Sequence, residues 1–125
     1  MLDVLLVGIG GFVGANARFI LSNWFARRMG TTFPYGTLFI NVSGSFILGL
    51  FLALVGRSIL ADETYRWLVA VGFCGGYTTF STYTYETLTL IRDTGFWRGI
   101  VINLLGSYLL GLGGALIGFW LGNLL

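Results

Sequence analysis

The residues with the most chemical potential lie together in the middle of the sequence, from Gly72 to Glu86 (GFCGGYTTFSTYTYE). This stretch combines glycines, hydroxyl groups, aromatic rings and one carboxylate between apolar flanks. Gly75-Gly76 followed by Thr78-Thr79 is poor helix-forming sequence, so we predict that a helix breaks there. Inside a membrane, irregular backbone is tolerated where it is buried in protein, lines a cavity or coordinates an ion. We therefore predict a broken membrane helix that lines an ion pathway, with close helix contact as the alternative role of Gly75.

Two stripes of side chains follow the predicted break. Thr78, Thr82 and Glu86 recur every four residues, and Phe80 and Tyr83 lie three residues apart. These spacings place a polar stripe beside an aromatic stripe on one half-helix. Aromatic residues at helical spacing usually pack in a core, and that remains the alternative interpretation of Phe80 and Tyr83. The neighbouring break favours the wall of an ion pathway.

A second polar stripe lies between residues 36 and 55, where Thr37, Asn41 and Ser45 recur every four residues on one helical face. An amide without a partner in a membrane costs several kcal/mol, so Asn41 must find a hydrogen-bonding group or water. It could bond a neighbouring helix or face an ion. Asn103 and Ser107 form a similar polar face nearer the end of the chain.

The composition identifies the elements that must position these residues. Of 125 residues, 56% are hydrophobic and 10% are charged, whereas about 25% are charged in ordinary soluble domains. A membrane crossing takes about 20 apolar residues, and four such stretches occupy about residues 4–25, 36–55, 67–90 and 99–121. We therefore predict an all-α membrane protein: one four-span domain over residues 1–125, with the third helix broken near its middle.

The residue inventory excludes several classes of site. The sequence has no His and a single cysteine, Cys74, which excludes a Ser-His triad, an intrachain disulfide and a thiolate or imidazole metal cluster. We therefore expect no enzymatic activity. The seven basic residues are all Arg and are scattered, whereas nucleic-acid binding needs a basic patch.

Two ionisable residues in the apolar stretches need an explanation. Arg18 interrupts the first stretch, and a charge at membrane depth costs about 2.5–3.5 kcal/mol on insertion scales. It should face a water-filled vestibule or snorkel toward the helix end. Glu86 would repel an anion if it were ionised in the pathway, so we expect it to be hydrogen-bonded, protonated or turned aside.

Charge and glycine patterns bear on topology and assembly. With four spans both termini share one side, and the opposite side carries four Arg in its joints against two. This slight bias permits insertion in both orientations.

Four thin helices enclose little space, so we hypothesise an antiparallel homodimer. We expect its interface at seams of small residues, which favour close helix contact in lipid: Gly8, Gly10, Gly11 and Gly14 in the first span, and Ser107, Gly111, Gly114 and Gly118 in the fourth.

Three motifs occur in order along the chain: GGxxGAxxR at residues 10–18, GTLxxNxxGSF at 36–46 and GFxGGYTTFST at 72–82. Together they resemble the bacterial fluoride channel family, called Fluc or CrcB, over the whole chain. The resemblance implies a dual-topology homodimer, a subunit paired with an inverted copy of itself, spanning the bacterial plasma (inner) membrane in contact with lipid. It also implies two fluoride pores that export fluoride passively from the cytoplasm and lower its toxicity.

The resemblance further implies roles for individual residues. A structural sodium ion at the dimer interface would be held by the backbone carbonyls of Gly75 and Thr78. Pore positions would be Phe80, position 83 and the amide of Asn41. At position 83 the family commonly has a second phenylalanine, whereas this chain has Tyr83, whose hydroxyl adds a hydrogen-bond donor.

The chemistry of fluoride suits the same residues. A strongly hydrated anion needs donors that replace its water, yet no single site may bind it too tightly. The Asn41 amide and the positive edges of aromatic rings can provide this. So can the hydroxyl groups of Thr37, Ser81, Thr82 and Ser107.

Two other functions remain alternatives. A small dual-topology proton-coupled multidrug transporter would want an acid deep in the first span, where the sequence has only Asp3 at the edge. A non-conducting structural membrane subunit would use its glycines and hydroxyls for packing alone. The resemblance favours the channel over both.

Overall fold

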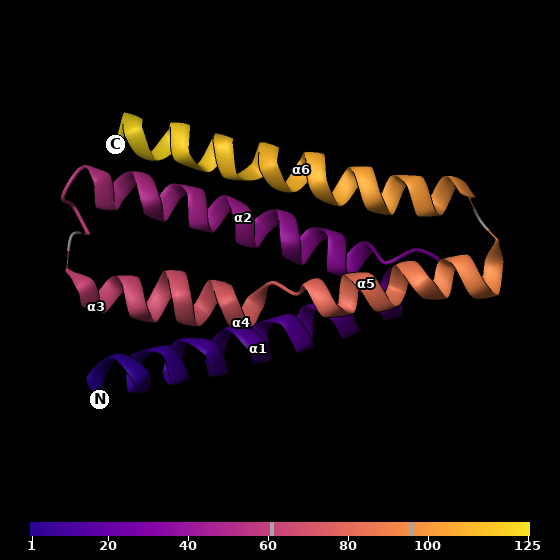
Figure 1. Cartoon of the computed structure of the whole chain (residues 1–125), viewed down its shortest axis with the longest axis horizontal. Helices are drawn as coiled ribbons and strands as arrows, with labels where there is room; N and C mark the ends of the chain where they lie inside the picture. The colour runs from indigo at the N-terminus through magenta and orange to yellow at the C-terminus, as the bar shows by residue number, and fades with distance from the viewer. Residues whose placement is uncertain (61, 96) are drawn as a thin grey trace.

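A computed structural model describes residues 1–60, 62–95 and 97–125, and these form four antiparallel helical segments with no strand among them (Figure 1). The first two are α1 (Leu2–Met29) and α2 (Tyr35–Gly56), and the last is α6 (Trp97–Leu124). In the sequence, α2 is followed by a third segment, residues 63–94, which is divided into shorter elements and precedes α6. Both chain ends lie at the same end of the molecule (Figure 1).

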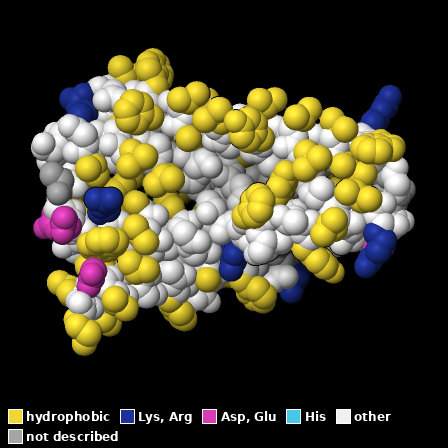
Figure 2. All heavy atoms as spheres, viewed as in Figure 1, with side chains coloured by type: hydrophobic (Ala, Val, Ile, Leu, Met, Phe, Trp, Pro, Cys, Tyr) yellow, Lys and Arg dark blue, Asp and Glu magenta, His cyan; other side chains and the backbone are white. Residues whose placement is uncertain are grey.

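Three helices, α1, α2 and α6, are long and apolar enough to cross a membrane, with 28, 22 and 28 residues. The predicted stretches 4–25, 36–55 and 99–121 lie inside them. Hydrophobic side chains cover much of the visible surface, whereas most charged ones lie toward its two ends (Figure 2). Such a surface suits contact with lipid. The prediction of an all-helical membrane protein is confirmed.

The third segment contains five helical elements: α3 (Glu63–Tyr65), the π-helical η1 (Arg66–Cys74), α4 (Gly75–Tyr77), α5 (Phe80–Thr89) and the π-helical η2 (Leu90–Thr94). Asp62 caps its start by accepting a hydrogen bond of 2.8 Å from the Thr64 amide, and hydrogen bonds from Thr64 lower the pKa of Asp62. Between α4 and α5 the backbone is extended at Thr78 (φ −76°, ψ 158°) and Thr79 (φ −152°, ψ 120°).

Glycines allow the helices of this chain to pack with backbone against backbone. A Cβ atom at Gly10 or Gly14 of α1 would collide with carbonyl oxygens of η1, and one at Gly49 of α2 would collide with Ala115 of α6. Gly118 of α6 likewise lies against the backbone of Phe46. These contacts pair α1 with the third segment and α2 with α6.

The expected use of the glycine seams at a dimer interface is therefore wrong for most of these positions. Gly10, Gly14 and Gly118 are buried against helices of the same chain, and Gly114 faces Val42. In contrast, Gly8 has open space around it. Close helix contact was the correct reading of the pattern, but sequence spacing does not distinguish a contact within a subunit from one between subunits.

Gly118→Val tests this packing. Its side chain would press on the α2 backbone, so we expect loss of folded protein or an unfolding midpoint well below that of the native chain, because overpacking costs about 1–3 kcal/mol or more. Gly113→Val on the same helix is the control, since nothing lies within 4 Å of a Cβ there. Thermal unfolding in detergent measures both variants. Equal midpoints would contradict the packing of α2 on α6.

Candidate functional site

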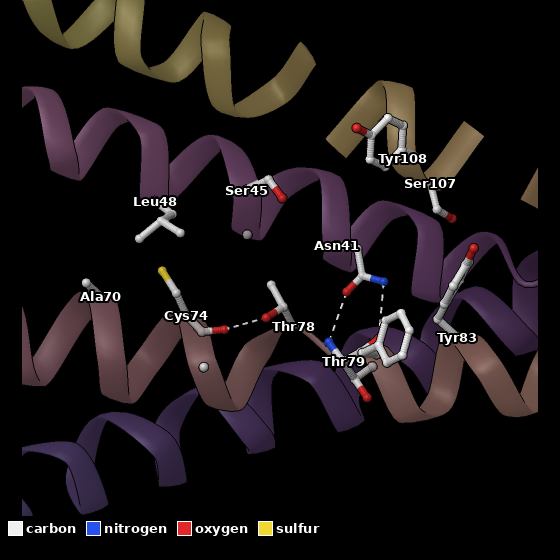
Figure 3. A pocket seen from close by; sticks show the side chains of 13 residues that line it. Asn41, Ser45, Leu48, Ala70, Cys74, Thr78, Thr79, Tyr83, Ser107 and Tyr108 are labelled. Atoms are coloured by element: carbon white, nitrogen blue, oxygen red, sulfur yellow. Dashed lines mark hydrogen bonds between the residues drawn. The ribbon is translucent and has the colours of Figure 1, made fainter. Parts of the chain in front are cut away.

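A cavity of about 460 Å³ lies where α2, the α4–α5 junction and α6 meet (Figure 3). Four predicted pore residues line it, namely Asn41, Phe80, Tyr83 and Ser107, as do Gly75 and Thr78, the predicted sodium ligands. The rest of its wall consists of Gly44, Ser45, Leu48, Ala70, Cys74, Thr79 and Tyr108. The cavity thus brings together residues that the sequence separates by more than 60 positions.

Asn41 holds the backbone of Thr79 by two hydrogen bonds. The Thr79 amide donates to Asn41 Oδ1 at 2.9 Å, and Asn41 Nδ2 donates to the Thr79 carbonyl at 3.3 Å (Figure 3). The extended backbone takes the Thr79 amide away from its helical acceptor, and Thr79 is buried. Asn41 replaces that acceptor, and it adds a second donor to the Thr79 carbonyl, which as the N-cap carbonyl also accepts within α5. One of the two possibilities for Asn41, a bond to a neighbouring helix, is realised.

The same arrangement leaves the carbonyl groups of residues 75–78 without their helical donors, and the two predicted sodium ligands are among them. In a continuous helix, Gly75 would receive the amide of Thr79 and Thr78 would receive the amide of Thr82. Here the Thr79 amide donates to Asn41, and the Thr82 amide donates to the Thr79 hydroxyl at 3.3 Å. The carbonyl oxygens of Gly75 and Thr78 are thus available at the end of α4.

α5 starts at this point with a threonine cap. The Thr79 hydroxyl accepts from the Thr82 amide and lies 3.1 Å from the Thr82 hydroxyl and 3.3 Å from that of Ser81. The first amides of a helix carry a partial positive charge and the last carbonyls a partial negative one. The end of α4 therefore favours a cation, and the start of α5 favours an anion. Ser81 and Thr82 themselves do not line the cavity.

Two aromatic rings of α5 form part of the cavity wall. The Phe80 and Tyr83 ring centroids are 5.7 Å apart and the rings are tilted by 41°. Phe80 is 79% exposed in the single chain, and Tyr108 on the facing helix is 70% exposed. Core packing within the subunit therefore does not account for Phe80.

Thr37 and Glu86 lie at a second, smaller cavity of about 200 Å³, formed by the end of α1, the start of α2 and α5. Thr37 is buried, and its hydroxyl donates to Glu86 Oε1 at 2.9 Å. Glu86 Oε2 is buried and has no hydrogen-bond partner among the described residues. Of the three expectations for Glu86, a hydrogen bond is realised. Thr37 does not line the larger cavity, although Asn41 on the same stripe does.

Arg18 is half-buried near the middle of α1 and lines neither cavity. Among the wall residues that sequence reasoning did not assign to the site are Thr79 and Tyr108, which both carry hydrogen-bonding side chains. Thr79 carries a detectable signal, because a threonine before a helical stretch is a typical N-cap. Tyr108 carries no sequence signal beyond its position next to Ser107. Whether its side chain faces the cavity depends on how α6 is rotated against α2.

The described helices and this cavity define an apolar helical membrane protein with a polar site beside a helix interruption. The chain belongs to the CrcB-like protein family, because a family model described as "CrcB-like protein, Camphor Resistance (CrcB)" matches residues 5–119. The family expected from the three motifs is therefore confirmed.

Curated relatives match over nearly the full length. The chain is 49% identical over 118 residues to the fluoride-specific ion channel FluC 2 of Moorella thermoacetica, covering 94% of this chain and 91% of the relative. It is 46% identical over 114 residues to the fluoride-specific ion channel FluC of Koribacter versatilis, covering 91% and 90%. It is 40% identical over 117 residues to that of Roseiflexus sp., covering 94% of each. All three are named as ion channels, a class of proteins that are not enzymes.

Asn41→Leu tests the pairing with Thr79. The substitution leaves the buried amide of Thr79 without a partner, at a cost of about 1–3 kcal/mol, and removes one donor from its carbonyl, so the unfolding midpoint should fall markedly. The matched control is Asn16→Leu, because the amide of Asn16 only bonds the Phe12 carbonyl of its own helix and is exposed. Thermal unfolding of purified protein compares the two. A similar small shift in both variants would contradict the role assigned to Asn41.

Proposed function

We propose that this chain forms a fluoride-specific ion channel that lets fluoride leave the cytoplasm down its gradient and so lowers its toxicity. The observation that carries the proposal is the interrupted third segment, whose backbone is held by Asn41 beside a cavity lined by aromatic edges and hydroxyl groups. The names of the curated relatives support fluoride as the ion.

Fluoride must exchange its water for donors along the pathway. Asn41 has a second amide hydrogen beyond the one given to Thr79, the start of α5 carries partial positive charge, and the edges of Phe80 and Tyr83 are positive. Ser107 adds a hydroxyl on the opposite wall, which would turn from its long 3.5 Å bond to Asn103 Oδ1 to donate to the anion. None of these groups is a fixed cation, so the anion meets several moderate sites and can leave each of them.

We propose that the third segment crosses the membrane as one broken helix, which gives four spans, and that the channel is an antiparallel homodimer. A second copy would cover the open side of the cavity, where Phe80 and Gly75 are exposed. The carbonyls of Gly75 and Thr78 suit a sodium ion, because their helical donors are engaged elsewhere and freed carbonyls at helix breaks commonly bind this ion. Such an ion would fix the two copies to each other.

The remaining predicted residues extend the pathway on either side of the rings. Ser81 and Thr82 lie at the first turn of α5, next to the Thr79 cap. Thr37 lies at the smaller cavity with Glu86, which we assign to the mouth of the pathway. Arg18 would attract anions to a vestibule. A bacterial plasma (inner) membrane is the location that fits export from the cytoplasm.

Flux from liposomes tests the function. Purified protein in vesicles loaded with fluoride and chloride should release fluoride rapidly and no chloride above protein-free vesicles, as followed with two ion-selective electrodes. Equal release of both ions, or no release of either, would contradict a fluoride-specific channel. Proton-driven drug uptake without fluoride release would instead support the transporter alternative.

Phe80→Ile tests the aromatic wall. Loss of the ring edge removes a contact of about 0.5–1.5 kcal/mol, so fluoride flux should fall by up to about tenfold while the dimer stays assembled. Phe119→Ile is the control, because Phe119 is a half-exposed ring on α6 away from the cavity. The same flux in both variants would remove Phe80 from the pathway.

Removal of sodium tests the cation site. A ligand at 100 times its Kd stabilises the bound state by about 2.7 kcal/mol, so exchange of sodium for N-methylglucamine should lower the unfolding midpoint and favour single subunits in detergent. Potassium at the same concentration controls for ionic strength. Unchanged midpoint and assembly in N-methylglucamine would exclude a structural sodium ion.

A further inference from the structure

Asn103 is a fully buried polar residue of α6 that does not line either cavity. Its Nδ2 donates to the hydroxyl of Thr87 on α5 at 2.8 Å, and Thr87 is itself buried at 7% exposure. Two polar side chains that meet away from water stabilise one arrangement of their helices strongly, because any other arrangement leaves them without partners.

The hydrogen bonds continue from this pair in both directions. The Thr87 hydroxyl donates to the Tyr83 carbonyl at 2.8 Å, and the Ser107 hydroxyl makes a long, weak hydrogen bond of 3.5 Å to Asn103 Oδ1. Since Thr87 accepts from Asn103 and donates to Tyr83, the donor-to-acceptor direction of this series of hydrogen bonds is fixed. The series begins at Ser107 and ends at Tyr83, and both residues line the larger cavity.

α5 needs such an anchor. It has 10 residues, and Thr87 is its one buried residue. A helix this short is marginal without tertiary contacts. Asn41 fixes the residue that caps α5, and Thr37 reaches Glu86 from α2. Among the described residues, only Asn103 forms a side-chain hydrogen bond from α6 to α5.

We infer that Asn103 is a positioning residue: through Thr87 it fixes the rotation and height of α5 against α6, and thereby places Phe80 and Tyr83 at the cavity opposite Ser107. The inference rests on the proposed function for its flux readout only. Asn103 itself does not contact the ion.

A double-mutant cycle with Asn103→Leu and Thr87→Val tests the inference. We expect each single variant to lose about tenfold in fluoride flux per folded dimer at a temperature well below its unfolding midpoint, because a lost buried hydrogen bond shifts the α5 placement by about that factor. The double variant should be no worse than either single one. Thr87→Ser keeps the hydroxyl and should restore the flux.

Two controls match the substitutions. Asn123→Leu removes an α6 amide and Thr84→Val removes an α5 hydroxyl. Within the described part of the chain, the first bonds only the Phe119 carbonyl and the second only the Phe80 carbonyl. Both should keep native flux. Lowered midpoints with native flux in the two single variants, or losses that multiply in the double variant, would overturn the positioning role.

The unfolding midpoints of the native protein, the two single variants Asn103→Leu and Thr87→Val and the double variant separate this inference from the proposed function. If the native protein releases no fluoride, the channel proposal fails. The positioning role of Asn103 is then tested by the double-mutant cycle calculated from the unfolding midpoints alone. A double variant whose midpoint shift equals that of one single variant supports the Asn103–Thr87 bond, whereas additive shifts overturn it.

Discussion

The structure depends on one constraint: a chain that leaves the helical conformation inside a membrane has no water to satisfy its backbone. The extended residues Thr78 and Thr79, which we propose to lie within the membrane, meet this constraint with side chains. Asn41 bonds both backbone groups of Thr79, and the Thr79 hydroxyl accepts from the Thr82 amide in the first turn of α5. The carbonyls of residues 75–78 are left over, and among them we assign those of Gly75 and Thr78 to a cation.

The surrounding helices hold this junction by close packing. Gly10 and Gly14 bring α1 against the backbone of the third segment, and Gly44 leaves room on α2 for Thr78 and Tyr77. The Ser43 and Tyr77 hydroxyls lie 2.9 Å apart and add a hydrogen bond between α2 and α4. Because α1 and α2 both pack against this junction, the end of α4 and the start of α5 stay at one cavity with opposite partial charges. This separation is the reason why we propose a cation and an anion at the same junction.

Hydropathy and spacing predicted the long apolar helices and the polar stripes, because both follow directly from residue types along a helix. They also predicted that Asn41 needs a partner, but not that the partner is the backbone of Thr79, which depends on the relative height of α2 and the third segment. Thr37 lies on the same stripe of α2 as Asn41, yet it lies at the smaller cavity with Glu86. The stripe extends over more than one turn of α2, so its residues contact different parts of the neighbouring segment. The glycine seams failed as an interface prediction for the same reason: rotation of α6 brings Gly118 to α2.

A crystal structure of the purified protein grown in sodium and fluoride tests the central claim most directly. The account predicts two inverted copies with an ordered sodium ion between them, bounded by the carbonyls of Gly75 and Thr78 from each copy, and Asn41 bonded to Thr79 in both. A continuous helix through Thr78 and Thr79, or an interrupted one whose Gly75 and Thr78 carbonyls bind no ion, would contradict it.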